Sequence, residues 1–281
     1  MKIETTNIVD VRTGSTQVNK VYLGSNLVWQ SFVGLLDLYP NAAAAYSLRR
    51  LRTNYSGSAI RVRRTDNTEQ DIGFVNNELD TTSLLSFVGS GDGFVVTFYG
   101  QSSNLINSTQ STAASQGKIV NSGSLNTKNG KPCVLFNGTS NTYPLPSGTN
   151  DATIFSVGAI DVDDSTFFNL GGVLTSLGTA TSVNNVIGVR GREGITSGAY
   201  VLGAQFLAAT MYINTTDFYL NGTQESGSDT IRANFAGSYL GSRNLDYYLD
   251  GSFQEYVVYQ SDESTDRSAI ETNINDFYSI Y

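Results

Sequence analysis

The sequence contains no histidine, one cysteine and two methionines. Without histidine, Ser–His and Cys–His nucleophile systems and histidine-based metal sites are excluded. One cysteine cannot form an intrachain disulfide, so packing, oligomerisation or bound ions must stabilise the fold. Cys133 lies in the apolar run 132–136, which predicts a buried small side chain rather than a reactive thiol.

Long hydrophobic runs are also missing. Hydrophobic residues form 40% of the chain and charged residues 15%, which excludes a disordered protein. No stretch approaches the roughly 18 apolar residues that a membrane helix needs, so we expect no membrane insertion. Residues 1–6 show no apolar run, and we therefore expect no secretory leader and synthesis in a cytoplasm. The formal net charge of −8 argues against a nonspecific nucleic-acid binder.

Positive charge gathers in one segment only. In residues 59–63 arginines alternate with apolar residues, which predicts a strand with the arginines on its outer face. The pattern favours a solvated face paired with acidic neighbours over a phosphate or polyanion site. The cluster comprises Arg49, Arg50, Arg52, Arg61, Arg63 and Arg64.

The residues that are abundant favour strands and tight turns. The chain has 28 Gly, 16 Tyr and 14 Phe but only 4 Pro. From residue 93 onward short apolar runs alternate with Gly/Asn clusters, which predicts an all-β, two-sheet jelly-roll sandwich with a few short helices. Asn221-Gly222 after an alternating run predicts a hairpin. Helices are expected over 42–51, 80–88 and 264–278, the last with Ile270, Ile274 and Phe277 on one face.

Residues 1–33 are predicted to form a small N-terminal β module, and 34–281 the sandwich with its C-terminal helix. Runs 18–23 and 27–29 flank Gly24-Ser25-Asn26, which indicates a hairpin. Because one hairpin is marginally stable alone, this one needs another surface to dock on.

Three segments carry a resemblance to a known family. They are 46–64, then 98–104 with 129–138, and finally 255–275. Together they resemble the concanavalin A-like sandwich of the catalytic domain of fungal α-L-arabinofuranosidase B. They are also similar to bacteriophage virion proteins that carry this sandwich, and residues 21–29 look like a short module at the start of phage tail and fibre proteins.

The resemblance implies a double-sheet jelly roll used for sugar recognition on a particle. In the hydrolase family an acidic residue stands where this chain has Gly100, and a glycine where it has Ser103. The family's nucleophile and acid would fall near residues 168–174 and 239–243, where no carboxylate occurs and Arg243 stands about where the acid is wanted. A retaining glycosidase needs two carboxyl groups about 5 Å apart, so we expect no enzyme and no catalytic residue.

The first hypothesis is therefore a non-enzymatic virion structural protein of a tail fibre, baseplate or capsid surface. Such a protein would be made in the host bacterial cytoplasm and located in the virion. Its partners would be other virion proteins, bound through residues 1–33, and further copies of itself, most plausibly in a trimer. The alternatives are a lectin-like receptor-binding module for host surface polysaccharide and, third, an arabinofuranosidase-type glycoside hydrolase.

Sugar sites combine aromatic faces with amide, carboxylate and guanidinium groups that fix hydroxyls. Two acidic clusters, Asp161/Asp163/Asp164 and Asp246/Asp250, favour solvated turns over Ca²⁺ ligands or a catalytic pair, and no other cofactor is expected. The glycan-binding candidates are Tyr99, Gln101, Asn104, Tyr143, Arg190, Arg192, Tyr247 and Tyr248.

Overall fold

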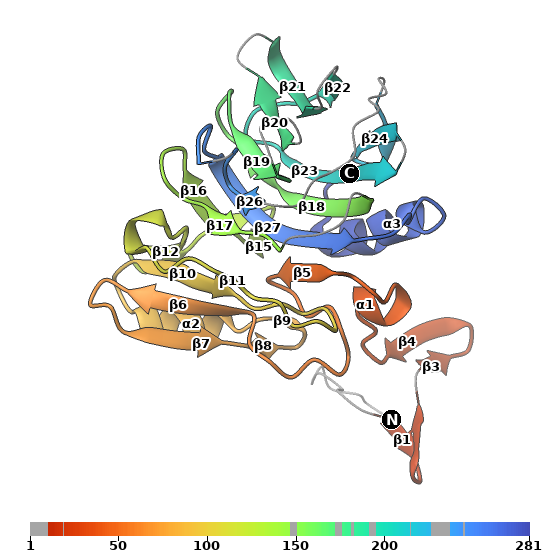
Figure 1. The fold of residues 1–281 in the computed structure, drawn as a ribbon. Helices are drawn as coiled ribbons and strands as arrows, with labels where there is room; N and C mark the ends of the chain where they lie inside the picture. Colours follow the sequence, from red (N-terminus) through yellow and green to blue (C-terminus); the bar gives the residue numbers. More distant parts are fainter. Residues whose placement is uncertain are drawn as a thin grey trace.

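The computed structural model describes residues 11–18, 20–146, 151–171, 176–180, 183–190, 195–213, 215–225, 237–243 and 245–281. Over these ranges the chain is mostly strand, which confirms the predicted all-β sandwich (Figure 1). No helix in these ranges is long and apolar enough to cross a membrane.

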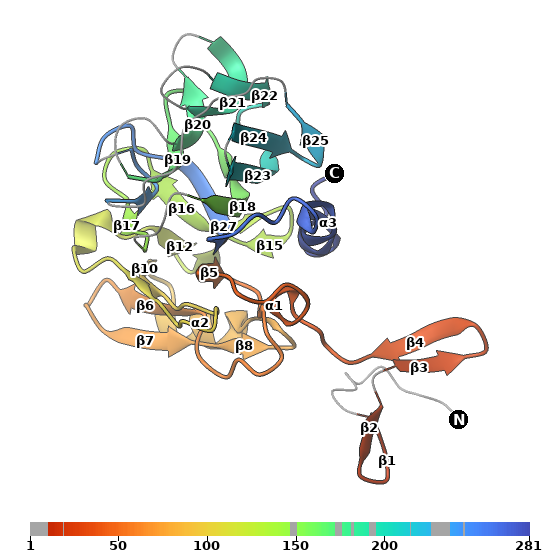
Figure 2. The same ribbon diagram turned by 45° about the vertical axis from the view of Figure 1, so that its right-hand side comes forward.

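Two hairpins stand at the N-terminal end, apart from the remaining strands in both views (Figures 1 and 2). They are β1 (Val11–Thr13) with β2 (Thr16–Val18), and β3 (Lys20–Leu23) with β4 (Asn26–Gln30). The second is the hairpin predicted from Gly24-Ser25-Asn26, and Gly24 has the positive φ, 65°, that its turn requires. Tyr22, Leu23 and Val28 on this hairpin are exposed.

The large sheet has thirteen strands in an antiparallel array. Its path runs β25-β24-β23-β18-β27-β16-β12-β10-β6-β7, with β5, β11 and β13 paired to its side. The strands are β5 (Ala44–Ser47), β6 (Ile60–Arg64), β7 (Glu69–Ile72), β10 (Gly93–Phe98), β11 (Ser108–Thr109), β12 (Lys118–Asn121), β13 (Ser124–Leu125), β16 (Val134–Asn137), β18 (Ala152–Ile160), β23 (Gln205–Ile213), β24 (Thr215–Leu220), β25 (Thr223–Gln224) and β27 (Asp250–Tyr259).

A second sheet of six strands packs against it. Its order is β17-β26-β19-β20-β21-β22, formed by β17 (Tyr143–Pro144), β26 (Tyr239–Leu240), β19 (Thr166–Asn169), β20 (Ser176–Ala180), β21 (Val183–Arg190) and β22 (Ile195–Ala199). Two small hairpins complete the strands: β8 (Phe74–Val75) with β9 (Glu78–Leu79), and β14 (Thr127–Lys128) with β15 (Lys131–Pro132).

Aromatic side chains fill the space between the sheets. Phe253 of β27 lies with its ring centroid 4.9 Å from that of Phe98 and 6.2 Å from that of Phe167, which belongs to the smaller sheet. All three side chains are buried. The Phe253 and Phe98 rings meet edge to face, a packing that contributes beyond the area that it removes from water.

The outer face of the large sheet is covered by the C-terminal helix. α3 (Arg267–Tyr278) buries Ile270 and Ile274 against Phe155 and Val157 of β18, which confirms the helix predicted from its apolar spacing. The remaining helical segments are α1 (Leu35–Leu38), α2 (Thr81–Val88) and the 3₁₀ turn η1 (Ala113–Ser115). α2 is the predicted helix at 80–88, capped by Asp80, whose carboxylate accepts the Ser83 N–H at 2.9 Å.

The helix expected over 42–51 is wrong. Its centre forms the strand β5, which pairs antiparallel with β27. Tyr46 stacks on Tyr256 with centroids 6.4 Å apart, so pairing and aromatic burial override the helix propensity of the alanines. The alternating arginines, by contrast, do form the outer face of β6, and Cys133 is buried, as predicted. Burial raises the pKa of the Cys133 thiol to about 12, which makes it unreactive.

Candidate functional site

A pocket of about 620 Å³ opens where three strands of the large sheet end together. Asn137 at the end of β16 pairs with Asp250 at the start of β27, and Ile160 at the end of β18 pairs with Gly251. The connecting loops therefore meet at one edge. We call this the Tyr247 pocket; it is lined by Gly138, Thr139, Val162, Asp163, Asp164, Ser165, Asp246, Tyr247, Tyr248 and Asp250.

Four carboxylates surround this pocket. Asp163 and Asp164 come from the loop after β18, and Asp246 and Asp250 from the loop before β27 and its first position. None of the four has a Lys or Arg nitrogen within 4.0 Å in the described ranges. Asp163 Oδ1 is buried and has no hydrogen-bond partner among the described residues. A buried acceptor without a partner costs free energy that a ligand hydroxyl could recover.

Asp250 is the carboxyl group whose ionisation is perturbed. Burial raises its pKa above the ordinary value, and the negative charge of Asp161 raises it further. The two residues are held together because the Asp161 N–H donates to the Asp250 carbonyl at 2.8 Å. Asp250 is therefore better suited to hold a proton than an isolated aspartate.

Tyr247 is fixed at the pocket wall by its own backbone. Its N–H donates to Asp246 Oδ1 at 2.9 Å, and its carbonyl accepts the Thr166 N–H at 3.1 Å. Its φ of 48° lies in the left-handed region, a strained conformation for a residue with a side chain. The Tyr247 side chain remains 37% exposed. The pocket thus holds an aromatic ring that a ligand can reach.

Gly138 makes room for Asp250. Its φ is 70°, and a Cβ at this position would lie 3.0 Å from both Cβ and Oδ2 of Asp250. Its N–H donates to the Leu249 carbonyl at 2.8 Å. Only glycine combines this backbone conformation with this close approach.

The structure brings together two of the predicted glycan-binding residues, Tyr247 and Tyr248, and joins them to both acidic clusters. That convergence was not predicted, because the pairing of β16, β18 and β27 cannot be read from local spacing. These aspartates do not form a metal site. In the described ranges, no group of three or more Asp, Glu or Cys side chains is arranged to hold a metal ion.

The other predicted glycan-binding residues lie elsewhere. Tyr143 is fully buried, and its hydroxyl donates to the Val95 carbonyl at 2.6 Å. Gln101 is also fully buried and holds backbone atoms of β5 and the segment after it. The Tyr99 hydroxyl donates to Asp71 at 2.8 Å, and the amide of exposed Asn104 donates to the Ala43 carbonyl. Arg192 and the side chain of Arg190 lie outside the described residues.

The two segments in which the resemblance places the hydrolase carboxylates are neighbours. β19 pairs with β26 in the smaller sheet through Phe168 and Leu240. After β26 stands Ser242, fully buried, with its hydroxyl 2.8 Å from that of Thr142. Residues 172–175, just beyond β19, lie outside the described part of the chain.

No protein-family model and no curated protein sequence matches the chain. Solved structures do. A GH54 α-L-arabinofuranosidase soaked with a cyclic sulfate inhibitor superimposes with a TM-score of 0.64 at 18% identity. The match covers 86% of this chain and 65% of the hydrolase chain. An arabinofuranosidase complexed with arabinofuranosyl-α-1,2-xylobiose gives a TM-score of 0.60 at 19% identity, covering 86% of this chain and 64% of that chain.

The chain shares the β-sandwich fold of these arabinofuranosidase structures. This finding confirms the expected jelly-roll sandwich with arabinofuranosidase-like architecture. The chain spans slightly less than two thirds of the hydrolase structures that it matches.

The same likeness contradicts the expectation that the protein is not an enzyme. Three structures of arabinofuranosidases share its fold at TM-scores of 0.60 to 0.64. The expectation rested on carboxylates missing from two family positions. It did not foresee that four carboxylates gather instead at the Tyr247 pocket.

Proposed function

We propose that this protein recognises carbohydrate and that the Tyr247 pocket is the binding site. One observation carries the proposal: two tyrosines and four aspartates from separate loops line a single pocket. The tyrosine ring offers an apolar face to the C–H side of a sugar ring, and carboxylates accept hydrogen bonds from its hydroxyls. The carbohydrate-active fold of the neighbouring structures supports this ligand class.

The charge of the pocket favours a neutral sugar. Asp163, Asp164 and Asp246 are acceptors without a lysine or arginine partner in the described chain, so an anionic ligand would be repelled. A polyol hydroxyl donates to the unpartnered Asp163 Oδ1 without adding charge. The proposed ligand is therefore a neutral oligosaccharide.

A glycan microarray followed by titration calorimetry tests the proposal. We expect the wild-type protein to bind neutral oligosaccharides. Tyr247→Ala should weaken that binding at least about tenfold, because it removes the ordered aromatic ring on which the sugar stacks. Tyr22→Ala is the matched control, because Tyr22 is a surface tyrosine on the separate β3–β4 hairpin. If no neutral glycan on the array bound the protein, or if Tyr247→Ala and Tyr22→Ala bound with equal affinity, the proposal would be wrong.

Glycoside hydrolysis is a second candidate function, favoured by the raised pKa of Asp250 in the same pocket. Release of 4-nitrophenol from 4-nitrophenyl α-L-arabinofuranoside, a compound with which one of the neighbouring structures was soaked, measures it directly. Asp250→Asn should abolish release, whereas Asp217→Asn, a substitution on the distant strand β24, should not. Turnover that survives Asp250→Asn contradicts a role for Asp250.

The bacteriophage particle, the homo-oligomer and attachment through residues 1–33 stay predictions from the sequence. The exposed Tyr22, Leu23 and Val28 on the protruding β3–β4 hairpin support attachment, because exposed apolar clusters mark contact surfaces (Figure 2). Mass spectrometry of purified particles should detect this chain, and deletion of residues 1–33 should remove it from them.

A further inference from the structure

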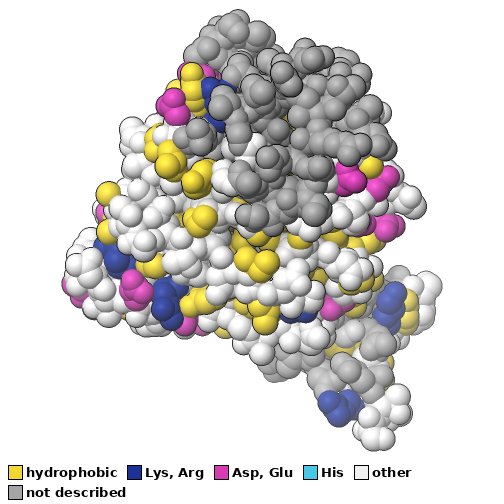
Figure 3. Space-filling model, in the orientation of Figure 1, with side chains coloured by type: hydrophobic (Ala, Val, Ile, Leu, Met, Phe, Trp, Pro, Cys, Tyr) yellow, Lys and Arg dark blue, Asp and Glu magenta, His cyan; other side chains and the backbone are white. Residues whose placement is uncertain are grey.

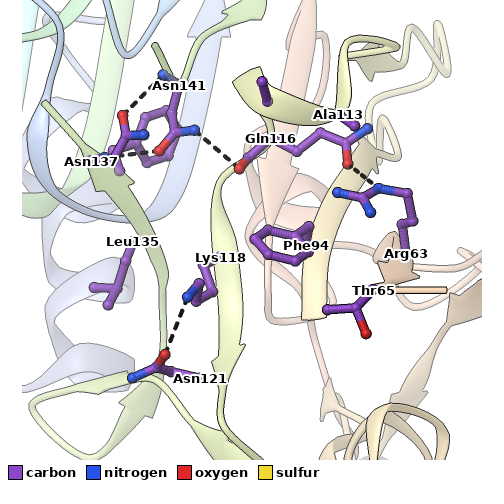
Figure 4. Close-up of a pocket in the computed structure, with 12 residues that line it drawn as sticks. Arg63, Thr65, Phe94, Ala113, Gln116, Lys118, Asn121, Leu135, Asn137 and Asn141 are labelled. Carbon is purple, nitrogen blue, oxygen red and sulfur yellow. Dashed lines mark hydrogen bonds between the residues drawn. The ribbon is translucent and has the colours of Figure 1, made fainter. Parts of the chain in front are cut away.

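A second hollow, of about 700 Å³, lies over the outer face of four strands of the large sheet. Arg63, Phe94, Lys118 and Leu135 are successive cross-strand partners on β6, β10, β12 and β16. Three strand spacings of about 4.8 Å make this row roughly 14 Å long. Gln116 and the loop 137–141 form its rim (Figure 4). We call this surface the Phe94 groove.

Arg63 differs from the charged groups around it. On the same face Arg61 forms a bidentate pair with Asp71. Arg64, the next residue of β6, lies over Phe87 and pairs with Asp66 (Figure 3 shows both signs of charge intermixed over β6 and β7). Arg63 instead donates to three neutral acceptors: Gln116 Oε1 at 2.8 Å, the Arg64 carbonyl at 3.1 Å and Asn67 Oδ1 at 3.2 Å. No carboxylate of the described residues lies within 4.0 Å of it.

This unbalanced guanidinium is held in a fixed place. Its central carbon lies 4.8 Å from the centroid of the Phe94 ring, and its Nε is tied to Gln116, which is almost fully buried. Figure 4 shows the Arg63 side chain and Gln116 joined at one side of the groove. Little side-chain entropy remains to be lost when an anion binds.

Lys118 supplies a second cation on the other side of Phe94. Its ammonium lies 5.6 Å from the ring centroid and donates to Asp92 at 2.8 Å and to Asn121 Oδ1 at 3.2 Å. Asp92 balances this charge, so among the described residues Arg63 is the cation of the groove without a carboxylate within 4.0 Å; Glu69, its cross-strand partner on β7, lies 4.0 Å from Arg61. The amide of Asn121 and the apolar Leu135 continue the floor of the groove.

We propose that the Phe94 groove binds the carboxylate-bearing residue of an acidic oligosaccharide. Arg63 Nε and Nη1 already donate to Gln116, Arg64 and Asn67, so Nη2 donates to the carboxylate, while Lys118 and the amides bind neighbouring hydroxyls. The loop 137–141 lines both hollows: Gly138 and Thr139 face the Tyr247 pocket, and Asn137 and Asn141 the Phe94 groove. The choice of a sugar as the carrier of the carboxylate rests on the proposed function.

Nucleic acid fits the groove less well. Backbone phosphates need several uncompensated cations along a track, and this groove offers one on a chain with a net charge of −8. An acidic sugar, with one carboxylate among several hydroxyls, matches a groove that offers the Arg63 guanidinium beside side-chain amides.

Titration calorimetry with a galacturonic acid hexamer and a sialylated trisaccharide tests the proposal. We expect at least one to bind, with an affinity that falls as salt rises, and its methyl ester to bind at least about tenfold more weakly. Arg63→Gln should lower the affinity for the acid by a similar factor. Arg63→Lys, which keeps the charge but loses the guanidinium N–H groups that hold the side chain and reach the ligand, should give an intermediate loss.

Arg61→Gln is the matched control, since Arg61 lies two residues away on the same face but is neutralised by Asp71. Failure of both acids to bind, equal losses for Arg61→Gln and Arg63→Gln, or tighter binding of a single-stranded oligonucleotide overturns the proposal. Tyr247→Ala separates the two sites: it should weaken neutral ligands and leave the Arg63 effect on acidic ligands in place. Thermal melts confirm that each variant folds.

Discussion

The guanidinium carbon of Arg243 lies 3.7 Å from the centroid of the Tyr247 ring. The two residues also belong to one tight loop, in which Arg243 and Asp246 exchange backbone hydrogen bonds of 2.8 and 3.0 Å. The cation therefore orients the ring at the pocket wall. By the family resemblance Arg243 stands about where a hydrolase acid would be wanted; in this structure it supports an aromatic wall.

Arg243→Ala should weaken neutral-glycan binding about two- to fivefold, because an exposed cation–π contact contributes about 0.5–1 kcal/mol to fixing the ring. Arg243→Lys should retain part of the effect. Calorimetry with the array-selected ligand measures both, and wild-type affinity in Arg243→Ala would show that the ring needs no support.

Gly138→Ala should lower both stability and carbohydrate affinity. The positive φ costs about 1–2 kcal/mol for alanine, and its Cβ would press on Asp250. Gly130→Ala is the matched control: its φ is 73°, but a Cβ there would meet nothing within 4 Å. Urea denaturation should show a loss for both variants, and titration a loss for Gly138→Ala alone. Equal carbohydrate affinities for Gly138→Ala and Gly130→Ala would show that Gly138 does not shape the pocket.

Glu271 gives the protein a measurable pH dependence. Burial raises its pKa to about 7, although the nearby Arg267 acts in the opposite direction. Since the folded state holds this proton more tightly than the unfolded chain, the contribution is present below pH 4.5 and is lost as pH rises towards 7. Urea midpoints at pH 5 and 8 should converge in Glu271→Gln. If the urea midpoints of Glu271→Gln differed between pH 5 and pH 8 as much as those of the wild type, the pH dependence would not come from Glu271.

Arg49 and Glu255 form the buried ion pair that joins the segment after β5 to β27. Arg49 Nε and Nη2 lie 2.8 and 2.9 Å from the two carboxylate oxygens, and Glu255 is fully buried. Glu255→Ala leaves an uncompensated buried charge and should cost about 3–5 kcal/mol of unfolding free energy. Asp71→Ala, which breaks the exposed pair with Arg61, should cost no more than about 1 kcal/mol. Denaturation curves that show similar losses would contradict this difference.

Local patterns predicted much of the fold because they act over a few residues. The spacing of Ile270 and Ile274 predicted α3, and Asn221-Gly222 predicted the β24–β25 hairpin, where both residues have positive φ. The segment 42–51 failed because its strand exists only through pairing with β27, about 200 residues further along the chain. Such a long-range contact does not affect the spacing of hydrophobic residues within the segment, from which its secondary structure was predicted.

The site was harder to predict for the same reason. Tyr247 and Tyr248 were named from residue type, but their union with Asp163 and Asp164 depends on the order of strands in the sheet. At Gly100, by contrast, the structure explains a difference that the sequence already showed. This chain has glycine where the hydrolase family has an acidic residue, and a Cβ there would lie 2.2 Å from the Ile106 carbonyl oxygen, so the backbone leaves no room for a side chain.

A crystal structure of the protein soaked with the neutral oligosaccharide selected on the array tests the central claim most directly. The account predicts electron density for a sugar ring against Tyr247, with a hydroxyl within hydrogen-bond distance of Asp163 Oδ1. Sugar density at another surface, with the Tyr247 pocket holding only water, would contradict it.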